Sequence, residues 1–471
     1  MGKFKLLIFL ALLTFYNFIS FGQIVEDSLV FGKFGKINIY KPGIEPAEVV
    51  IFASGDAGWK YGVIDMAQKL AKEGALVLGI DIKHYMQVLQ REKVHCHYIS
   101  ADFEILNQYI QKKYHFKKYT LPVLAGYSSG ATLIYGIIAQ APEKTYKGGL
   151  ALGFCPDISI NRPLCKGSGL SYDSIEHGYL LKPRKNLTTP FIVINGQLDE
   201  VCDEKITKDF MSEIKNGKFY YLPHVGHGFT KPGNWVPAFL EGYHFIIGSF
   251  AGIIRQTTED ELEKLPIVIT PAATEIHNMP FIVGISGDGG WKGMIETMAL
   301  KFADRGIPVA GIDALRYFWN YVSPEKAAED VGNVIADYMQ KWNKSEVILL
   351  GYSFGADVLP FIVNRLPEYL RHEIKMVVLM SPDKSADFEF HFTDWFDESS
   401  RDAYNVAPEL QRLKAAPTVI IYGEKENDSL VKHISNRKVR IIKVPGDHHY
   451  NYDTENLVNL IVKEIEAVGL E

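Results

Sequence analysis

Short apolar runs alternate with amphipathic stretches along most of the chain. Residues 49–53 form a continuous apolar run of the kind found in strands buried on both faces of a sheet. A helical period follows up to Gly74, and a second apolar run occupies residues 75–80. Strands alternating with helices in this way predict a mostly parallel sheet with helices on both faces. Ahead of this unit, the alternation from Leu29 to Tyr40 predicts an edge strand.

The same pattern occurs a second time further along the chain. Residues 55–81 and 287–313 align without a gap, and about half of the aligned residues are identical. The separation between the copies exceeds the period of solenoid repeats, so it indicates duplication of a whole domain. A length of 471 residues also exceeds one ordinary core. We therefore predict an α/β fold with two tandem doubly wound domains, at residues 23–255 and 265–471, joined by a polar linker at 256–264.

Each half contains a serine between two glycines, directly after an apolar run. Gly-Tyr-Ser-Phe-Gly surrounds Ser353, and Gly-Tyr-Ser-Ser-Gly surrounds Ser128. A strand, a sharp turn with such a serine and then a helix is the sequence form of a nucleophile elbow. The glycines leave room where strand and helix crowd the turn, so the hydroxyl can be held exposed. The motif alone occurs by chance in many chains, and its placement between strand and helix is what favours a nucleophile.

A serine hydroxyl is a poor nucleophile until a base, an orienting acid and oxyanion donors surround it. In doubly wound hydrolases these groups follow in the order serine, acid, histidine. The first half supplies Ser128, then Asp199 just past an apolar run, then His227. We prefer His227 to His224 as the base because it follows a glycine in the loop after the strand.

The second half supplies the same order. Ser353 is followed by the acidic loop that contains Glu426 and Asp428, and then by His448 and His449. Aligning the aromatic residue two places after each base selects His448. Asp428 is our preferred acid, with Glu426 the alternative, because this loop is longer than the one around Asp199.

A glycine-rich loop after an early strand provides candidate oxyanion donors in each half. Such loops expose backbone N–H groups where hydrolases of this kind place one donor, and the residue after the nucleophile supplies the other. A plain tight turn is the alternative interpretation, since glycine clusters mark turns. The predicted donors are Asp288, Gly289 and Phe354 in the second half, and Asp56, Ala57 and Ser129 in the first.

Two carboxylates of the second half are candidates for contact with a cationic substrate group. Asp313 follows a strand end at the same predicted sheet edge as Ser353, and Asp357 lies one helical turn beyond that serine. The alternative is that they form salt bridges with Arg316 or Arg365.

Composition and charge narrow the classes of function. A net charge of -6 gives no support for nucleic-acid binding, which needs a clustered basic face. Residues 1–22 predict an export signal, because Lys3 and Lys5 precede an apolar stretch; an uncleaved membrane anchor is the alternative, since the apolar region is long for a signal. The cysteines suggest one or two disulfides, with three possible connectivities; Cys155 and Cys165 flank a short loop and are candidates for local pairing. We predict no cofactor and no metal site, because C-x-x-C spacing is lacking.

With these residues assembled, the chain resembles the bacterial AcvB/VirJ family of exported α/β-hydrolase-like proteins. The second half resembles the VirJ domain, and the two-domain whole resembles the longer AcvB form. The motifs are specific together, although the elbow alone is not. They lie at residues 286–291, 311–319 and 351–360, and more loosely at 386–389 and 446–450.

The resemblance implies two tandem α/β-hydrolase-like domains and a periplasmic serine hydrolase. Its implied substrate is an aminoacylated phosphatidylglycerol at the membrane surface, such as the lysyl form, from which the amino acid is released. It also implies links to virulence and to secretion-system proteins. The ammonium group of an aminoacyl ester would suit Asp313 or Asp357. The competing hypothesis is a non-catalytic binding or secretion-adaptor protein on a retired hydrolase fold, but both halves keep complete sets of candidate residues, which favours an enzyme.

Overall fold

The computed structural model describes most of the chain between residues 24 and 468. The predicted signal peptide, residues 255–260 of the linker region and Asp428 lie outside the described residues, so those predictions stay predictions. The described residues are 24–60, 62–254, 261–274, 276, 279–391, 403–426, 430, 434, 436 and 438–468.

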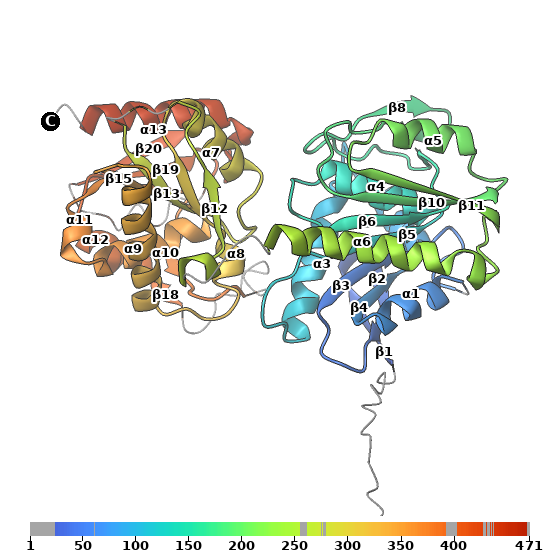
Figure 1. The fold of residues 1–471 in the computed structure, drawn as a ribbon. Coiled ribbons are helices and arrows are strands. Elements are labelled where there is room, and N and C mark those ends of the chain that lie inside the picture. Colours follow the sequence, from blue (N-terminus) through green and yellow to red (C-terminus); the bar gives the residue numbers. More distant parts are fainter. Residues whose placement is uncertain are drawn as a thin grey trace, which may run out of the picture.

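The N-terminal half is built on an eight-stranded sheet in the order β1-β2-β4-β3-β5-β6-β10-β11 (Figure 1). Strands β1 and β2 are antiparallel to their neighbours, whereas the pairs from β4 to β11 are parallel. The strands are β1 (Val25–Phe31), β2 (Gly35–Lys41), β3 (Glu48–Ala53), β4 (Ala75–Ile80), β5 (Val123–Tyr127), β6 (Gly148–Leu152), β10 (Phe191–Leu198) and β11 (Gly217–Gly226).

Helices cover both faces of this sheet, because alternate residues of its buried strands point to opposite sides. One apolar cluster contains α1 (Gly62–Lys72) and α6 (Val236–Ile254). The cluster on the other face contains α2, α3, α4 and α5. These are α2 (Ile82–Arg91), α3 (Ile99–Lys113), α4 (Ser129–Gln140) and α5 (Glu204–Ser212), next to a small sheet of β7 (Asp157–Ile158), β8 (Tyr172–Ile175) and β9 (Gly178–Leu181).

The C-terminal half repeats this plan with a seven-stranded sheet in the order β12-β14-β13-β15-β16-β19-β20. Only β12 runs antiparallel to its neighbour among these described strands. The strands are β12 (Ile267–Thr270), β13 (Phe281–Ile285), β14 (Val309–Ile312), β15 (Val347–Tyr352), β16 (Ile374–Met380), β19 (Thr418–Gly423) and β20 (Val439–Val444).

The helices of this half also divide between two faces. Helices α7 and α13 pack on one side of the sheet, as α1 and α6 do in the N-terminal half. Helices α8 to α12 pack on the other side. Their bounds are α7 (Met294–Asp304), α8 (Ala314–Tyr317), α9 (Pro324–Lys341), α10 (Phe354–Arg365), α11 (Glu368–Arg371), α12 (Val406–Arg412) and α13 (Thr454–Val468).

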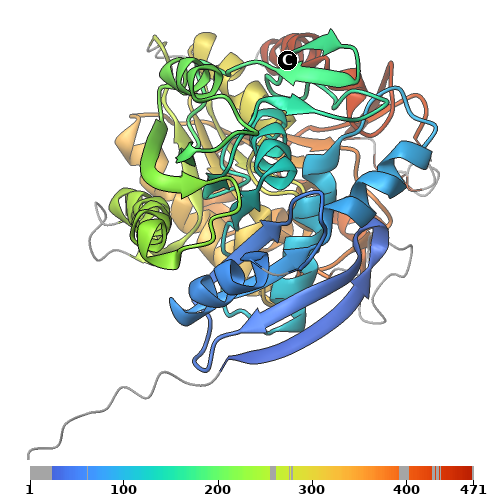
Figure 2. The same cartoon turned by 90° about the vertical axis from the view of Figure 1, so that its right-hand side faces the viewer.

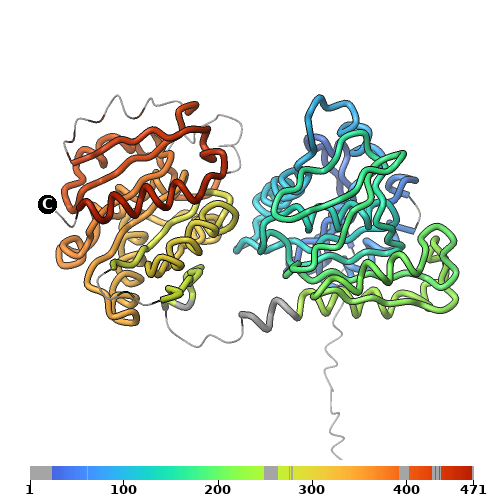
Figure 3. Tube along the Cα trace, turned by 90° about the horizontal axis from the view of Figure 1, so that it is seen from above, coloured from blue at the N-terminus to red at the C-terminus, as the bar shows by residue number. Residues whose placement is uncertain are grey.

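The two sheets confirm the predicted fold class. The order β2-β4-β3-β5-β6-β10-β11 has its equivalent in β12-β14-β13-β15-β16-β19-β20, so the duplication seen in the sequence is a duplication of topology. The tube in Figure 3 shows the two α/β bodies side by side.

The predicted edge strand from Leu29 to Tyr40 is wrong in one respect, because it is a hairpin. Strand β1 ends at Phe31, a short helical turn follows, and β2 then runs back antiparallel to β1 at the outer edge of the sheet (Figure 2). Gly32 and Gly35 have φ of 43° and 60°, in the left-handed region that glycine adopts without steric cost. Those two residues let the chain reverse.

The four cysteines form two disulfides, Cys96–Cys165 and Cys155–Cys202. The local pair between Cys155 and Cys165 is therefore wrong, because the tertiary structure brings each one closer to a distant partner. Cys165 donates its backbone N–H to His97, next to Cys96, at 2.9 Å. Disulfides persist in oxidising compartments, so the pairing agrees with export.

No helix among the described residues has the length and apolar character needed to cross a membrane.

Trp319 of the C-terminal domain is buried against the N-terminal domain. Its side chain is 1% exposed, and its Nε1 donates to the carbonyl of Phe116 at 2.7 Å. The ring lies 5.3 Å from that of Tyr119, and the Lys112 ammonium lies 4.6 Å from the ring centroid. These contacts hold the segment after α8 against the neighbouring domain.

Candidate active sites

Each candidate nucleophile lies at a strained turn between a strand and a helix. Ser128 separates β5 from α4 with φ of 55°, and Ser353 separates β15 from α10 with φ of 54°. The flanking glycines are required sterically: a Cβ at Gly130 would lie 2.2 Å from the carbonyl oxygen of Ser54. A Cβ at Gly355 would meet the carbonyl of Ile285 at the same distance. A non-glycine residue at positive φ costs energy that the surroundings must offset, which is typical of functional turns.

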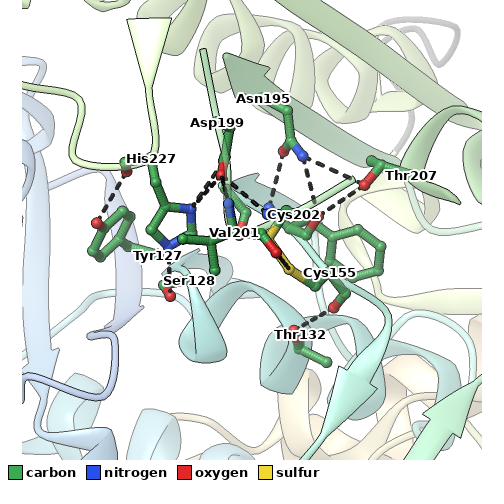
Figure 4. The surroundings of a disulfide bond; sticks show 12 residues. Tyr127, Ser128, Thr132, Cys155, Asn195, Asp199, Val201, Cys202, Thr207 and His227 are labelled. Carbon is green, nitrogen blue, oxygen red and sulfur yellow. Dashed lines mark hydrogen bonds and ion pairs between the residues drawn. A yellow bond between two sulfur atoms is a disulfide. The ribbon is translucent and has the colours of Figure 1, made fainter. Parts of the chain in front are cut away.

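The N-terminal site joins Ser128, His227 and Asp199 in a continuous hydrogen-bonded series (Figure 4). His227 Nε2 lies 2.9 Å from Ser128 Oγ, and His227 Nδ1 lies 2.9 Å from Asp199 Oδ2. The acid follows β10 and the histidine follows β11, so the three residues meet at the carboxyl ends of the parallel strands. His224 does not take part; its carbonyl accepts a hydrogen bond from Asn234.

The C-terminal site has the same arrangement with a glutamate as its acid. His448 Nε2 lies 2.9 Å from Ser353 Oγ, and His448 Nδ1 lies 3.0 Å from Glu426 Oε2. Of the two acids that the sequence left open, Glu426 is the one in contact, while Asp428 lies outside the described residues. His449 lies beside the site, with its Nδ1 2.9 Å from the hydroxyl of Tyr352.

Both acids are held in place by further hydrogen bonds. The Asp199 side chain is 1% exposed and accepts the backbone N–H groups of Val201 and Cys202 at 2.9 and 3.0 Å. Glu426 accepts the N–H of Gly423 at 2.6 Å and the hydroxyl of Ser381 at 2.7 Å. Burial opposes ionisation of Glu426, but the hydrogen bonds from His448, Gly423 and Ser381 outweigh it and lower its pKa. A carboxylate that stays ionised can orient the histidine and stabilise its protonated form.

The tyrosine before each serine is a site residue that the sequence reasoning missed. Tyr127 donates its hydroxyl to the carbonyl of His227 at 3.0 Å, and Tyr352 donates to the carbonyl of His448 at 3.3 Å. Each tyrosine therefore ties the histidine loop to the elbow. The signal was present in the sequence, since both copies read Gly-Tyr-Ser.

The glycine-rich loops pass directly against the serines. A Cβ at Gly55 would lie 3.1 Å from the Ser128 Cβ, and one at Gly287 would lie 3.3 Å from the Ser353 Cβ. Each loop is a turn closed by one backbone hydrogen bond, from Gly58 to Gly55 and from Gly290 to Gly287. That bond does not use the N–H groups of the two central turn residues. In the two domains these residues are Asp56 and Ala57, and Asp288 and Gly289.

The second predicted donor in each site is the first residue of the helix after the serine. Ser129 begins α4 and Phe354 begins α10. The first N–H groups of a helix have no acceptor within that helix, and the helix dipole favours negative charge at that end. The predicted donors thus lie where a developing oxyanion would need them, and their role stays a prediction.

The two carboxylates predicted to receive a cation differ in their partners. Asp313 caps α8 by accepting the N–H of Arg316 at 3.2 Å, and its Oδ2 lies 3.6 Å from the Arg316 guanidinium. Asp357 has no salt bridge among the described residues; it accepts the N–H of Asp383 at 2.6 Å. Burial raises the pKa of Asp357 well above the ordinary value, and the nearby Asp383 and Asp288 carboxylates raise it further. Asp357 is the better candidate because no cationic side chain among the described residues is paired with it, and an ammonium ligand would favour its ionised form.

One group near the N-terminal site has the donor types of a metal centre. Ligand atoms of Asp199, Cys202 and His227 lie within 4.8 Å of one another. The Cys202 sulfur is bonded to Cys155, so it is not available as a thiolate ligand. The histidine and aspartate are bonded to each other, which fits a proton relay better than a metal site.

The Cys155–Cys202 disulfide belongs to the loop that holds the acid of the N-terminal site, whereas the C-terminal domain contains no cysteine. Replacing both cysteines with serine should free that loop and slow the reaction of Ser128 with a fluorophosphonate by roughly 10- to 100-fold, because small misplacements of catalytic groups have effects of that size. Labelling of Ser353 should be unchanged. Peptide mapping of each labelled serine measures the two rates separately.

The matched control replaces Cys96 and Cys165, the other disulfide of the same domain. If replacing Cys96 and Cys165 slows Ser128 labelling as much as replacing Cys155 and Cys202 does, the cause is a general loosening of the domain and not displacement of Asp199.

A doubly wound parallel sheet with a strained serine after a central strand, and with an acid and a histidine after two later strands, defines an α/β-hydrolase. Both halves of the chain have this architecture. The model of the family described as bacterial virulence protein (VirJ) matches residues 47–151 and 280–468, more than half of the chain. This protein belongs to that family, as the resemblance in the sequence predicted.

Solved structures similar to this chain each correspond to about one of its domains. They include a dienelactone hydrolase from Anabaena variabilis (14% identity, 48% of this chain, 97% of that chain, TM-score 0.33). An esterase domain from Rhodothermus marinus is also similar (12% identity, 49% of this chain, 98% of that chain, TM-score 0.33). So is MenH from S. aureus (15% identity, 43% of this chain, 98% of that chain, TM-score 0.33). Similarity at this level does not identify a substrate. A search of curated proteins finds no match.

Proposed function

We propose that this protein is an exported serine hydrolase that cleaves the aminoacyl ester of an aminoacylated phosphatidylglycerol, such as the lysyl form. The observation that carries this proposal is the hydrogen-bonded series Ser353–His448–Glu426 with the carboxylate of Asp357 one helical turn from the serine. The series supplies a nucleophile, a base and an orienting acid. The carboxylate supplies a partner for the ammonium group that distinguishes an aminoacyl ester from other esters.

The reaction follows from the positions of these groups. His448 Nε2 takes the proton of Ser353 Oγ as this oxygen attacks the ester carbonyl, and the resulting oxyanion is held by N–H groups of Phe354 and of the loop at Gly289. The C–O bond to the lipid glycerol breaks, and His448 returns the proton to the leaving alkoxide. Water then attacks the acyl-enzyme, again through His448, and releases the free amino acid and Ser353.

Recognition of the ammonium group is assigned to Asp357. Its equivalent in the N-terminal domain, Thr132, lines the same cavity as Ser128, so this helix position faces the reacting centre. An ammonium ligand would favour the ionised form of a carboxyl whose pKa is otherwise raised. The carboxylates of Asp383 and Asp288 act on Asp357 and add to the negative potential there.

Location and partners follow from the same proposal. The disulfides suit an oxidising compartment, and we propose the periplasm. There the substrate would be presented at the membrane surface. Contacts with secretion-system proteins are a further expectation from the family and need a separate test.

The proposed ammonium contact makes a specific prediction about selectivity. Replacing Asp357 with Asn should raise the KM for lysyl-phosphatidylglycerol roughly 10- to 100-fold, the cost of losing a hydrogen bond to a charged group. The KM for the same lipid with acetylated amino groups should change little. Amino-acid release from vesicles containing each lipid measures both values.

Asp313→Asn is the matched control, since Asp313 is already engaged by Arg316 and should leave the KM unchanged. If Asp313→Asn and Asp357→Asn exchange these outcomes, the cation site is misassigned. If purified protein hydrolyses neither lipid and neither serine reacts with a fluorophosphonate, the adaptor hypothesis replaces the enzyme.

A further inference from the structure

A cavity of about 380 Å³ opens onto the candidate nucleophile of the N-terminal domain. Its lining includes Ser128, Ser129, Thr132 and Asp56. We propose that this cavity is a second, independent active site that hydrolyses esters of uncharged, hydroxyl-bearing compounds. This site is distinct from the one at Ser353, so the proposal does not depend on the function proposed for Ser353.

The first support is the residue one turn beyond each nucleophile. The C-terminal domain has the carboxylate of Asp357 at this position, whereas the N-terminal domain has Thr132. The Thr132 hydroxyl donates to the carbonyl of Cys155 and lines the cavity. A hydroxyl here cannot balance the charge of an ammonium group. It can accept a hydrogen bond from a neutral donor, such as a hydroxyl group of the substrate.

The second support is the charge of the remaining wall. Ser128 and Ser353 each donate their backbone N–H to the neighbouring strand, at the carbonyls of Leu152 and Met380. Three residues further on, the N-terminal domain has Cys155 of a disulfide, where the C-terminal domain has Asp383. The cavity therefore lacks equivalents of Asp357 and Asp383, and the carboxylates of its own lining are those of Asp56 and Asp157.

A lysine from α2 changes the charge in the same direction. Helices α2 and α8 are equivalent, because Asp81 caps the first as Asp313 caps the second. Two residues after each cap, Lys83 lines the cavity, whereas Leu315 is buried in the contact between the domains. Lys83 offsets part of the negative charge of Asp56 and Asp157, so the cavity is less favourable to a cationic substrate than the surroundings of Asp357 are.

The third support is an unsatisfied hydroxyl. Among the described residues, Ser129 Oγ is buried without a hydrogen-bond partner, although it belongs to the cavity lining. A buried polar atom of this kind is costly unless something satisfies it, which points to a group on a bound ligand. The equivalent Phe354 instead packs its ring 5.1 Å from that of Phe318.

Neutral polar side chains form a further part of the wall, beside Asp157 and several apolar residues. Gln87 and Gln90 extend from α2, and Ser159 follows β7. In the C-terminal domain the equivalent helix is only 4 residues long, against 10 for α2, so it provides no such wall. Amides and hydroxyls that both donate and accept are suited to a polyol or sugar that carries an acyl group.

The chemistry at this site balances without a cofactor. Ser128 Oγ attacks the ester carbonyl and transfers its proton to His227, whose Nδ1 is held by Asp199. The bond from the acyl carbon to the alcohol oxygen breaks, and the alcohol leaves with the proton from His227. Water attacks the acyl-serine, His227 takes one of its protons, and the acid is released as Ser128 regains its hydrogen.

The test uses the full-length protein and two methyl esters with the same leaving group, methyl glycerate and lysine methyl ester, with acid release followed by pH-stat. Ser353→Ala should keep hydrolysis of methyl glycerate and lose most of that of the lysine ester. Adding Ser128→Ala should remove the remaining activity. In the Ser353→Ala protein, Thr132→Asp should shift the ratio of kcat/KM toward the lysine ester at least tenfold, whereas Thr132→Val should not.

Fluorophosphonate labelling keeps this test independent of the choice of ester. We expect labelled peptides from Ser128 in the Ser353→Ala protein and none in the double variant. Labelling at Ser353 but not at Ser128 in the unaltered protein would overturn the second site and leave the proposed function intact. Labelling at Ser128 alone would support the second site while removing the proposed function of Ser353.

Discussion

Ser353→Ala should lower the hydrolysis of lysyl-phosphatidylglycerol by at least about 10³-fold and as much as about 10⁶-fold, the range seen when the nucleophile of a serine hydrolase is removed. The reason is that Ser353 Oγ is the atom that His448 Nε2 contacts, at 2.9 Å. Without that oxygen no acyl-enzyme forms. The KM should change little, because the alanine removes only one atom from the binding surface. Amino-acid release from purified protein and vesicles measures both parameters.

The comparison variant is Ser128→Ala, the same change at the equivalent elbow of the other domain. It should keep most of the activity toward the lysyl lipid, since the wall around Ser128 lacks the equivalent of Asp357. Undiminished turnover by Ser353→Ala, together with loss in Ser128→Ala, would reverse the assignment of the main site. Circular dichroism of both variants separates loss of chemistry from loss of folding.

Glu426→Gln should lower kcat by roughly 10⁴-fold, the effect of replacing the orienting acid in a serine–histidine–acid site. The carboxylate accepts from His448, Gly423 and Ser381 at 3.0, 2.6 and 2.7 Å. An amide has the size of the carboxylate but cannot stabilise the protonated histidine and favours the wrong tautomer. Initial rates with saturating substrate measure the effect.

Asp428→Asn is the control that separates the two acids of this loop. It should leave kcat within about a factor of two or three, the size expected for a surface substitution. A large loss in Asp428→Asn with a small one in Glu426→Gln would restore the acid that the sequence favoured.

The histidines and the acid differ in how far the sequence could assign them. His448 was selectable because an aromatic residue follows it by two places, as Phe229 follows His227. The acid was assigned wrongly to Asp428, although Glu426 follows Gly423 at the same spacing as Asp199 follows Gly196, a signal that the sequence reasoning missed. Three hydrogen bonds hold Glu426 in place, and two of them come from Ser381 and His448, which are distant in the sequence.

The cysteines show the same limit. Their even number and the predicted export signal predict disulfides, but three connectivities stay open, and proximity along the chain offers only Cys155 and Cys165 as a candidate pair. The fold instead places Cys155 next to Cys202, with their Cα atoms 5.2 Å apart, because β6 and β10 are neighbours in the sheet. Sheet order is a property of long-range packing, and local sequence carries little information about it.

The amino-acid sequence by itself determined the fold class, the duplication and the two elbows around Ser128 and Ser353. These features rest on local periodicity and on glycines whose need is steric, so they can be recognised from neighbouring residues alone. Only the tertiary structure decided that Glu426 contacts His448, that Asp313 is already paired with Arg316 while Asp357 is not, and that the cavity at Ser128 differs in charge from the surroundings of Ser353. Each of those depends on side chains from separate strands and helices, which meet only when the parallel sheet brings its carboxyl ends together.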